Sequence, residues 1–150
     1  MRLFDTHCHL QDSRLSTGIE GVLERAQAAG VQRLLCCGSE EADWGTTLSL
    51  AARYPALIRP ALGLYPRYVL GRSPTWLETL RAQVVSTGSA IGEIGLDHAF
   101  EPRNDADQEE VFVAQLKLAA ALRLPVSIHC RQAWGRMLEV LRDLRPLPPA

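Results

Sequence analysis

Short apolar runs alternate with amphipathic stretches along the whole chain, and this alternation occurs five times. Each apolar run has hydrophobic residues at both odd and even positions, which is typical of strands that are covered on both faces. We expect these strands over residues 2–9, 31–38, 57–64, 90–96 and 126–130. Such strands are typical of parallel sheets, so the pattern predicts that all five run in the same direction.

The stretches between the strands carry apolar residues at the spacing of a helix. Thr17 stands just before the first of these helical stretches, and a capping box that begins at Thr17 would start the helix. A second helix is expected around Trp44, and Ser73 and Pro74 predict the N-cap and the first position of a third helix. The two remaining helices are expected over residues 105–123 and 134–144.

Five strand-helix units in succession predict an α/β fold with right-handed crossovers, either a doubly wound sheet or a (β/α) barrel. Residues 10–14, which follow the first strand, contain no glycine, so the phosphate-binding turn of a dinucleotide fold is missing there. This favours the barrel. A chain of 150 residues is enough for one domain, and we expect residues 1–150 to form a single one.

The composition limits the partners of the chain. The 16 Lys and Arg residues nearly balance the 17 Asp and Glu residues, so no global basic field holds polyanions and any phosphate binding must be local. No secretory leader pattern or apolar stretch of membrane length occurs, which predicts a cytoplasmic protein with no membrane contact. The cysteines lie in apolar runs without Cys-x-x-Cys spacing, as in buried thiols of a reducing compartment. They are Cys8, Cys36, Cys37 and Cys130.

Two histidines stand at the end of the first expected strand. Side chains alternate along an extended chain, so His7 and His9 should project together with Asp5, while Cys8 points to the other side. Two neutral imidazole nitrogens can then bind one metal ion. The alternative is a pair of hydrogen-bonded histidines in the core.

Ionisable residues also stand in two later strands. Glu93 lies in an apolar run between Gly92 and Gly95, and a buried carboxylate there needs a cation, either a metal ion or an arginine. The two glycines allow another backbone or a ligand to come close. His129 lies near the end of the fifth strand, and its alternative role is again a core histidine. Since active groups of barrels gather at the carboxyl ends of the strands, the coincidence favours a metal site.

Three segments together carry a family resemblance. Residues 5–10, 91–97 and 124–131 resemble, in order and spacing, the motifs of the TatD-type metal-dependent deoxyribonucleases. The resemblance implies a TIM-type (β/α) barrel with two divalent ions, which could be Zn, Mg, Mn, Fe or Ni. It also implies that His7 and His9 bind the first ion, that Glu93 bridges both ions as the catalytic carboxylate, and that His129 binds the second. The implied activity is hydrolysis of DNA phosphodiester bonds from an end.

Other residues near these motifs could act around the substrate. Arg131 could bind a phosphate through two hydrogen bonds, or form a salt bridge on a helix surface instead. Asp97 could orient a ligand histidine. Where the family usually has Gly-x-His-Pro, this chain has Tyr65, which can donate a hydrogen bond to substrate but cannot titrate near neutral pH.

The family pattern continues with a sixth-strand histidine and an eighth-strand aspartate that residues 1–150 do not contain. We therefore expect this chain to supply about five of eight βα units, as the N-terminal part of a truncated barrel whose open edge promotes self-association. Two alternatives stay open. The same metal site could hydrolyse another ester, in a misacylated tRNA or a phosphate monoester, or the chain could be a catalytically incomplete metal-binding fragment.

Overall fold

Five parallel strands form one sheet in the order β1-β2-β3-β4-β5. The computed structural model describes residues 1–144 and 147, so the end of the chain at 145–146 and 148–150 lies outside the described residues. The strands are β1 (Leu3–Cys8), β2 (Val31–Cys37), β3 (Ile58–Leu62), β4 (Ala90–Asp97) and β5 (Val126–Arg131). All five expected strands are confirmed, with ends that differ by at most two residues.

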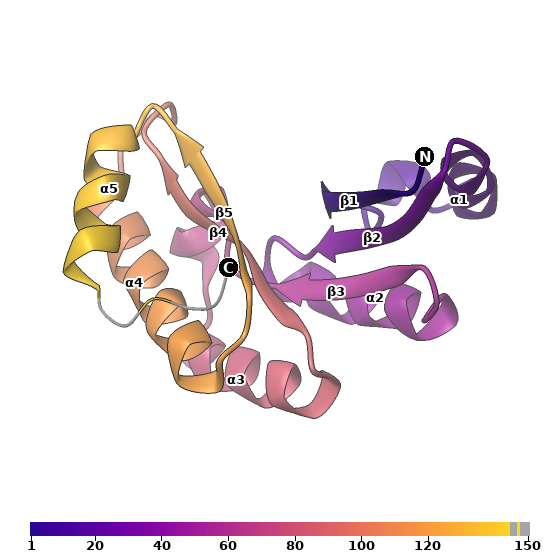
Figure 1. Cartoon of the computed structure of the whole chain (residues 1–150). Helices are drawn as coiled ribbons and strands as arrows, with labels where there is room; N and C mark the ends of the chain where they lie inside the picture. Colours follow the sequence, from indigo (N-terminus) through magenta and orange to yellow (C-terminus); the bar gives the residue numbers. More distant parts are fainter. Residues whose placement is uncertain (145–146, 148–150) are drawn as a thin grey trace.

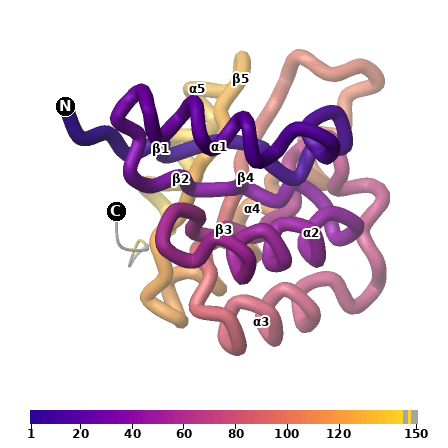
Figure 2. Tube along the Cα trace, turned by 90° about the vertical axis from the view of Figure 1, so that its right-hand side faces the viewer, coloured from indigo at the N-terminus to yellow at the C-terminus, as the bar shows by residue number. Residues whose placement is uncertain are grey.

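A helix follows each strand, which confirms the α/β fold and the succession of βα units that a TIM-type barrel requires. The helices are α1 (Ile19–Ala28), α2 (Glu41–Arg53), α3 (Trp76–Thr87), α4 (Asp105–Leu122) and α5 (Trp134–Asp143), and two 3-10 turns are η1 (Ser13–Leu15) and η2 (Pro66–Gly71). The helices lie around the outside of the curved sheet (Figure 1). In the view of Figure 2, α1, α2 and α3 follow one another in a single outer layer. Within the described part of the chain, no helix is long and apolar enough to cross a membrane.

Two predicted helix starts were wrong. Gly18, not Thr17, is the N-cap of α1, because the chain turns first and the Gly18 amide donates to the Leu15 carbonyl at 3.0 Å. Helix α3 begins at Trp76, after Ser73 and Pro74. The amide and the hydroxyl of Ser73 each lie 2.7 Å from the Glu41 carboxylate on α2, so this side chain ties two segments together instead of capping the helix.

The main core lies between the sheet and helices α3 to α5. Phe112 and Leu116 of α4 are fully buried there, beside Ile91 and Ile94 of β4. The same face of α4 buries Gln115, whose Oε1 accepts from the Leu64 amide at 2.7 Å and whose Nε2 donates to the Leu64 carbonyl at 3.2 Å. This side chain pairs both backbone groups where the chain leaves β3, which fixes the loop that begins there.

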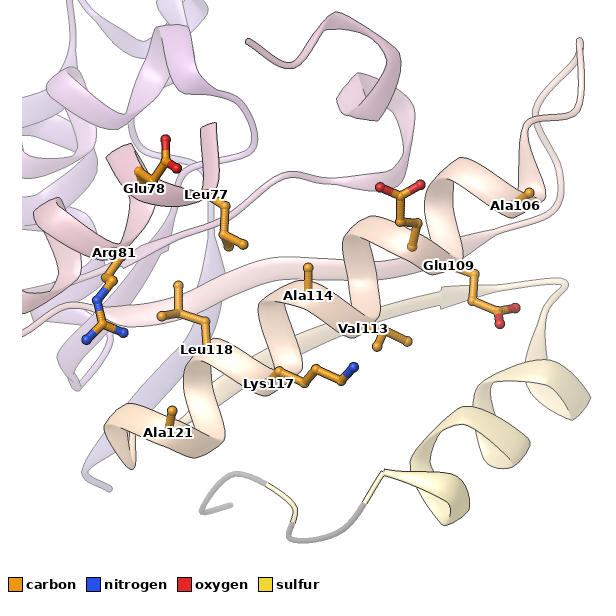
Figure 3. A pocket seen from close by; sticks show the side chains of 11 residues that line it. Leu77, Glu78, Arg81, Ala106, Glu109, Val113, Ala114, Lys117, Leu118 and Ala121 are labelled. Atoms are coloured by element: carbon orange, nitrogen blue, oxygen red, sulfur yellow. The ribbon is translucent and has the colours of Figure 1, made fainter. Parts of the chain in front are cut away.

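A hollow of about 930 Å³ separates α3 from α4 on the outside of the molecule (Figure 3). Leu77 of α3 and Val113, Ala114 and Leu118 of α4 form its apolar wall. It lies on the helical layer and shares no lining residue with the cleft at the strand ends described below.

Candidate metal centre

Strands β1, β4 and β5 bring four predicted ligands together. Nε2 of His7 lies 3.2 Å from Nε2 of His9, and each of these nitrogens lies 3.4 Å from Oε2 of Glu93. The other carboxylate oxygen, Oε1, lies 2.9 Å from Nδ1 of His129. Glu93 therefore sits at the centre of the cluster, with a pair of histidines on one oxygen and a single histidine on the other.

Strand alternation places the two N-terminal histidines on one side, as the sequence indicated. Cys8 between them points the other way, donates to the Leu35 carbonyl at 3.3 Å and packs against the core under α1. Asp5 also lies close, because its Oδ1 accepts from the His7 amide at 3.1 Å. The Cys37 thiol, which the sequence gave no reason to include, lies 3.8 Å from Nδ1 of His7.

The outward nitrogens of both imidazoles have partners. Nδ1 of His9 lies 2.8 Å from the Cys37 carbonyl and can only donate to it, which turns Nε2 of the same ring towards Glu93. Nδ1 of His7 lies 2.8 Å from the Ser127 hydroxyl on β5. Ligand atoms of His7, His9 and Glu93 lie within 4.8 Å of one another, so these three residues could hold one metal ion. Two imidazole nitrogens and one carboxylate oxygen suit a divalent transition metal.

Glu93 is buried, yet it is ionised. Burial would raise its pKa, but hydrogen bonds from His129, His7 and His9 outweigh this effect and hold the pKa of the Glu93 carboxyl well below its usual range. The same carboxylate raises the pKa of His9. The ion pairs of Glu93 in the described residues are with histidines, so the alternative of an arginine partner was wrong.

A chain of polar groups holds His129 from behind. Its Nε2 lies 3.0 Å from Oδ2 of the fully buried Asp97, and the Tyr65 hydroxyl donates to the same oxygen at 3.3 Å. Burial lowers the pKa of His129, but hydrogen bonds to Glu93 and Asp97 outweigh it, and the pKa is raised. Burial and the charge of Asp97 raise the pKa of Tyr65 to about 12. Tyr65 therefore stays a neutral donor that supports the Asp97 carboxylate.

Two glycines of β4 allow β5 to approach closely. A Cβ on Gly95 would stand 1.9 Å from the His129 carbonyl oxygen, and φ at Gly95 is 148°, a conformation that other residues rarely adopt. A Cβ on Gly92 would stand 2.8 Å from the Ser127 Cβ. The close neighbour that these glycines predicted is thus the backbone of β5, and its approach sets the positions of Ser127 and His129.

Two residues that support the site were not predicted from the sequence. Gln108 of α4 is buried, accepts from the Asp97 amide at 2.7 Å and donates to the Asp97 carbonyl at 2.9 Å. Ser127 contacts His7 from a strand that is distant in sequence. A usable signal existed for the first, since Gln108 and Gln115 stand seven residues apart within the apolar face of α4.

The cluster opens into a cleft of about 750 Å³ at the carboxyl ends of the strands. His9, Glu93 and His129 line it, together with Tyr65 and Tyr68. The predicted phosphate ligand Arg131 is exposed at the end of β5 and is not among the residues that line this cleft, although its charge acts on Tyr65.

Comparisons with known proteins agree with this architecture. The family model described as "TatD related DNase" matches residues 4–149. The "3'-5' ssDNA/RNA exonuclease TatD" of Erwinia tasmaniensis is 35% identical over 148 residues, which cover 96% of this chain and 56% of the relative. The "uncharacterized metal-dependent hydrolase YabD" of Bacillus subtilis is 32% identical over 144 residues, covering 94% of this chain and 55% of YabD.

A solved structure is also similar. The crystal structure of YJJV, a TatD homologue from Escherichia coli K12, matches with a TM-score of 0.89 and 32% identity, over 95% of this chain and 56% of YJJV. The chain thus spans little more than half the length of the relatives it matches.

Proposed function

This chain belongs to the TatD-related DNase family, and from that premise we propose that it contributes the metal centre of a divalent-metal-dependent phosphodiesterase that cleaves DNA from an end. The observation that carries the proposal is Glu93 held between His7 and His9 on one oxygen and His129 on the other. The name of the Erwinia relative, an exonuclease of single-stranded DNA and RNA, supports a nucleic acid as the substrate.

We propose that the cluster would hold two divalent ions. His7, His9 and Glu93 would hold one of them, and Glu93 with His129 would hold the other. Zn, Mn, Fe, Ni and Mg are all compatible with imidazole and carboxylate ligands. When bound, such ions lower the pKa of a water molecule and neutralise the charge that develops on the phosphate oxygens.

The residues of this chain have separate tasks in that reaction. Glu93 is the catalytic carboxylate, since it contributes the negative charge that balances both ions, and it is already ionised. Asp97 fixes the ring of His129, and Tyr65 supports Asp97 with its hydrogen bond. We propose that Arg131 at the end of β5 binds a phosphate further along the substrate through two hydrogen bonds.

A second candidate keeps the metal centre and changes the ester. The cleft is also lined by Asp12, Glu40 and Asp43, which disfavour a long polyanion and suit a substrate with fewer phosphates. A phosphate monoester would meet that condition, whereas a misacylated tRNA, whose ester the same centre could also hydrolyse, is itself a long polyanion and would not.

The experiment compares these substrates on one preparation. The full-length protein is stripped of metal, resupplied with each of the five ions, and assayed on single-stranded DNA, a phosphate monoester and a misacylated tRNA. Release of mononucleotides from an end of the DNA is expected. Faster cleavage of the phosphate monoester or the misacylated tRNA than of DNA would contradict the proposed substrate. No cleavage with any ion would refute the proposed hydrolase activity.

We also propose a cytoplasmic location, which the four free cysteines support. Exposed apolar side chains beside β5 support self-association. Ile128, Trp134 and Leu138 are 38%, 67% and 51% exposed, and they line one hollow of about 530 Å³.

A further inference from the structure

Three aromatic rings form a cluster beside His129, and two of them, Tyr65 and Tyr68, line the cleft. The Tyr65 ring centroid lies 4.7 Å from that of His129, 6.0 Å from that of Tyr68 and 6.1 Å from that of Phe100. Tyr68 belongs to η2 after β3, and Phe100 lies in the loop after β4. Two neighbouring loops thus build one aromatic surface that starts at the metal centre.

This surface is accessible and carries a cation. Tyr68 is 37% exposed and lines the same cleft as Glu93 and His129. The exposed Arg67 places its guanidinium carbon 5.6 Å from the ring centroid of Phe100. An arginine beside accessible aromatic rings is the combination that binds unpaired nucleobases in proteins that hold single strands.

General charge attraction does not supply the affinity for a nucleic acid here. The net charge of the chain is -1, and Arg14 at the cleft is paired with Asp12 at 2.5 Å. Contacts with the bases therefore have to contribute much of the binding free energy that phosphate contacts contribute in basic proteins.

We propose that Tyr68 and Phe100, together with Arg67, form a nucleobase subsite on which an unpaired base next to the cleaved phosphodiester stacks. This inference rests on the proposed function, because it assumes a nucleic acid at the metal centre. Tyr65 supports the subsite from below, since its hydroxyl is held by Asp97 while its ring contacts Tyr68. Paired bases are stacked inside a duplex and cannot reach the rings, so the subsite selects single strands.

The test measures binding without cleavage. Two fluorescein-labelled probes, a short oligothymidylate and an abasic deoxyribose-phosphate chain of the same length, are titrated with the full-length protein in the presence of a chelator. The wild-type protein is expected to bind the oligothymidylate roughly tenfold more tightly, and Tyr68→Ala should remove most of that preference. Tyr68→Phe keeps the ring and should keep the preference.

A matched control comes from another tyrosine beside an arginine. The guanidinium carbon of Arg53 lies 5.2 Å from the ring centroid of Tyr54, whose hydroxyl donates to Glu20 at 3.3 Å, away from the cleft. Tyr54→Ala should leave the ratio of the two affinities unchanged. A folded Tyr68→Ala protein with the full preference, a Tyr68→Phe protein without it, or a wild-type protein that does not distinguish the probes would each overturn the subsite.

The hydrolysis assay with added metal separates this inference from the proposed function. If the protein cleaves DNA but binds both probes equally well, the subsite is refuted and the proposed phosphodiesterase activity stands. If the protein prefers the probe with bases but cleaves no ester, the phosphodiesterase proposal is refuted and the subsite stands.

Discussion

The hydroxyl of Ser127 on β5 lies 2.8 Å from Nδ1 of His7 on β1, across 120 residues of sequence. A hydrogen bond to the outward nitrogen holds the plane of the imidazole ring. In this position Ser127 directs Nε2 of His7 at Glu93. The strand that carries His129 therefore also orients one imidazole of the His7–His9 pair.

We expect Ser127→Ala to weaken metal binding by roughly tenfold, because the His7 ring loses its partner while the ligand atoms stay in place. Competition with a fluorescent chelator measures the affinity. Ser86→Ala on α3 is the matched control, since the Ser86 hydroxyl bonds only the Gln83 carbonyl in its own helix. Equal metal affinity of Ser127→Ala and wild type would show that Ser127 does not orient His7.

Replacement of the central carboxylate tests the site most directly. Glu93→Gln keeps the size of the side chain and removes the charge that would balance the ions, so metal-dependent hydrolysis by the full-length protein should be abolished. Activity and bound metal are measured on the same sample, with Glu24→Gln on the exposed surface of α1 as the control. An active Glu93→Gln protein with its full metal content would refute the assignment.

The two N-terminal histidines should be separable from the fold. His7→Ala and His9→Ala are each expected to lose about one equivalent of tightly bound metal with an unchanged far-UV circular dichroism spectrum, as ligands rather than packing residues. Unfolding of either variant, with normal metal content in the molecules that remain folded, would identify that histidine as part of the core.

Much of this cluster could be predicted because its histidines and its carboxylate follow from local sequence patterns. Strand alternation alone puts His7 and His9 on one side, and an apolar run around Glu93 indicates a buried carboxylate that needs partners. Ser127 and Gln108 could not be found in this way. Their roles depend on how β5 crosses to β1 and how α4 lies on β4, and neither distance is encoded within one element.

The predicted helix starts failed for a related reason. Ser73 has the residue type of an N-cap, but its hydroxyl bonds Glu41 of another helix, so a tertiary contact overrides the local preference. Tyr65 shows the same limit at the site. Its position after β3 was predicted, whereas its hydrogen bond to Asp97 depends on the neighbouring strand.

Gln108 provides a test of stability. Gln108→Leu leaves the buried amide and carbonyl of Asp97 without partners, which should lower the free energy of unfolding by about 2 kcal/mol. Urea denaturation measures the change, and Gln27→Leu on the exposed side of α1 is the control. A change of stability no larger than that of the control would mean that Asp97 finds other partners.

The pair of Glu109 on α4 and Arg136 on α5 should give a pH-dependent contribution to stability. The hydrogen bond from Arg136 lowers the pKa of Glu109 from its ordinary value of 4.5. A carboxyl whose pKa is lower in the folded state stabilises the fold above its unfolded pKa, and this contribution is lost as the pH falls through the folded pKa. Glu109→Gln should therefore have a slightly lower Tm than wild type at pH 7, and the difference should vanish in acid. A difference that persists below both pKa values would assign the effect to packing instead.

Residues 1–150 expressed alone should self-associate through the surface beside β5. In the described part of the chain β5 pairs only with β4, and Trp134 and Leu138 expose apolar side chains next to its free edge. An unpaired strand beside exposed apolar groups favours association with a second chain. Light scattering should therefore give a mass above the monomer, and a double change of Trp134→Glu and Leu138→Glu should return it to the monomer. Val85→Glu introduces the same charge at a 61% exposed aliphatic residue of α3 and should leave the association intact. A monodisperse wild-type monomer, or dissociation by Val85→Glu as well, would show that the surface beside β5 does not drive assembly.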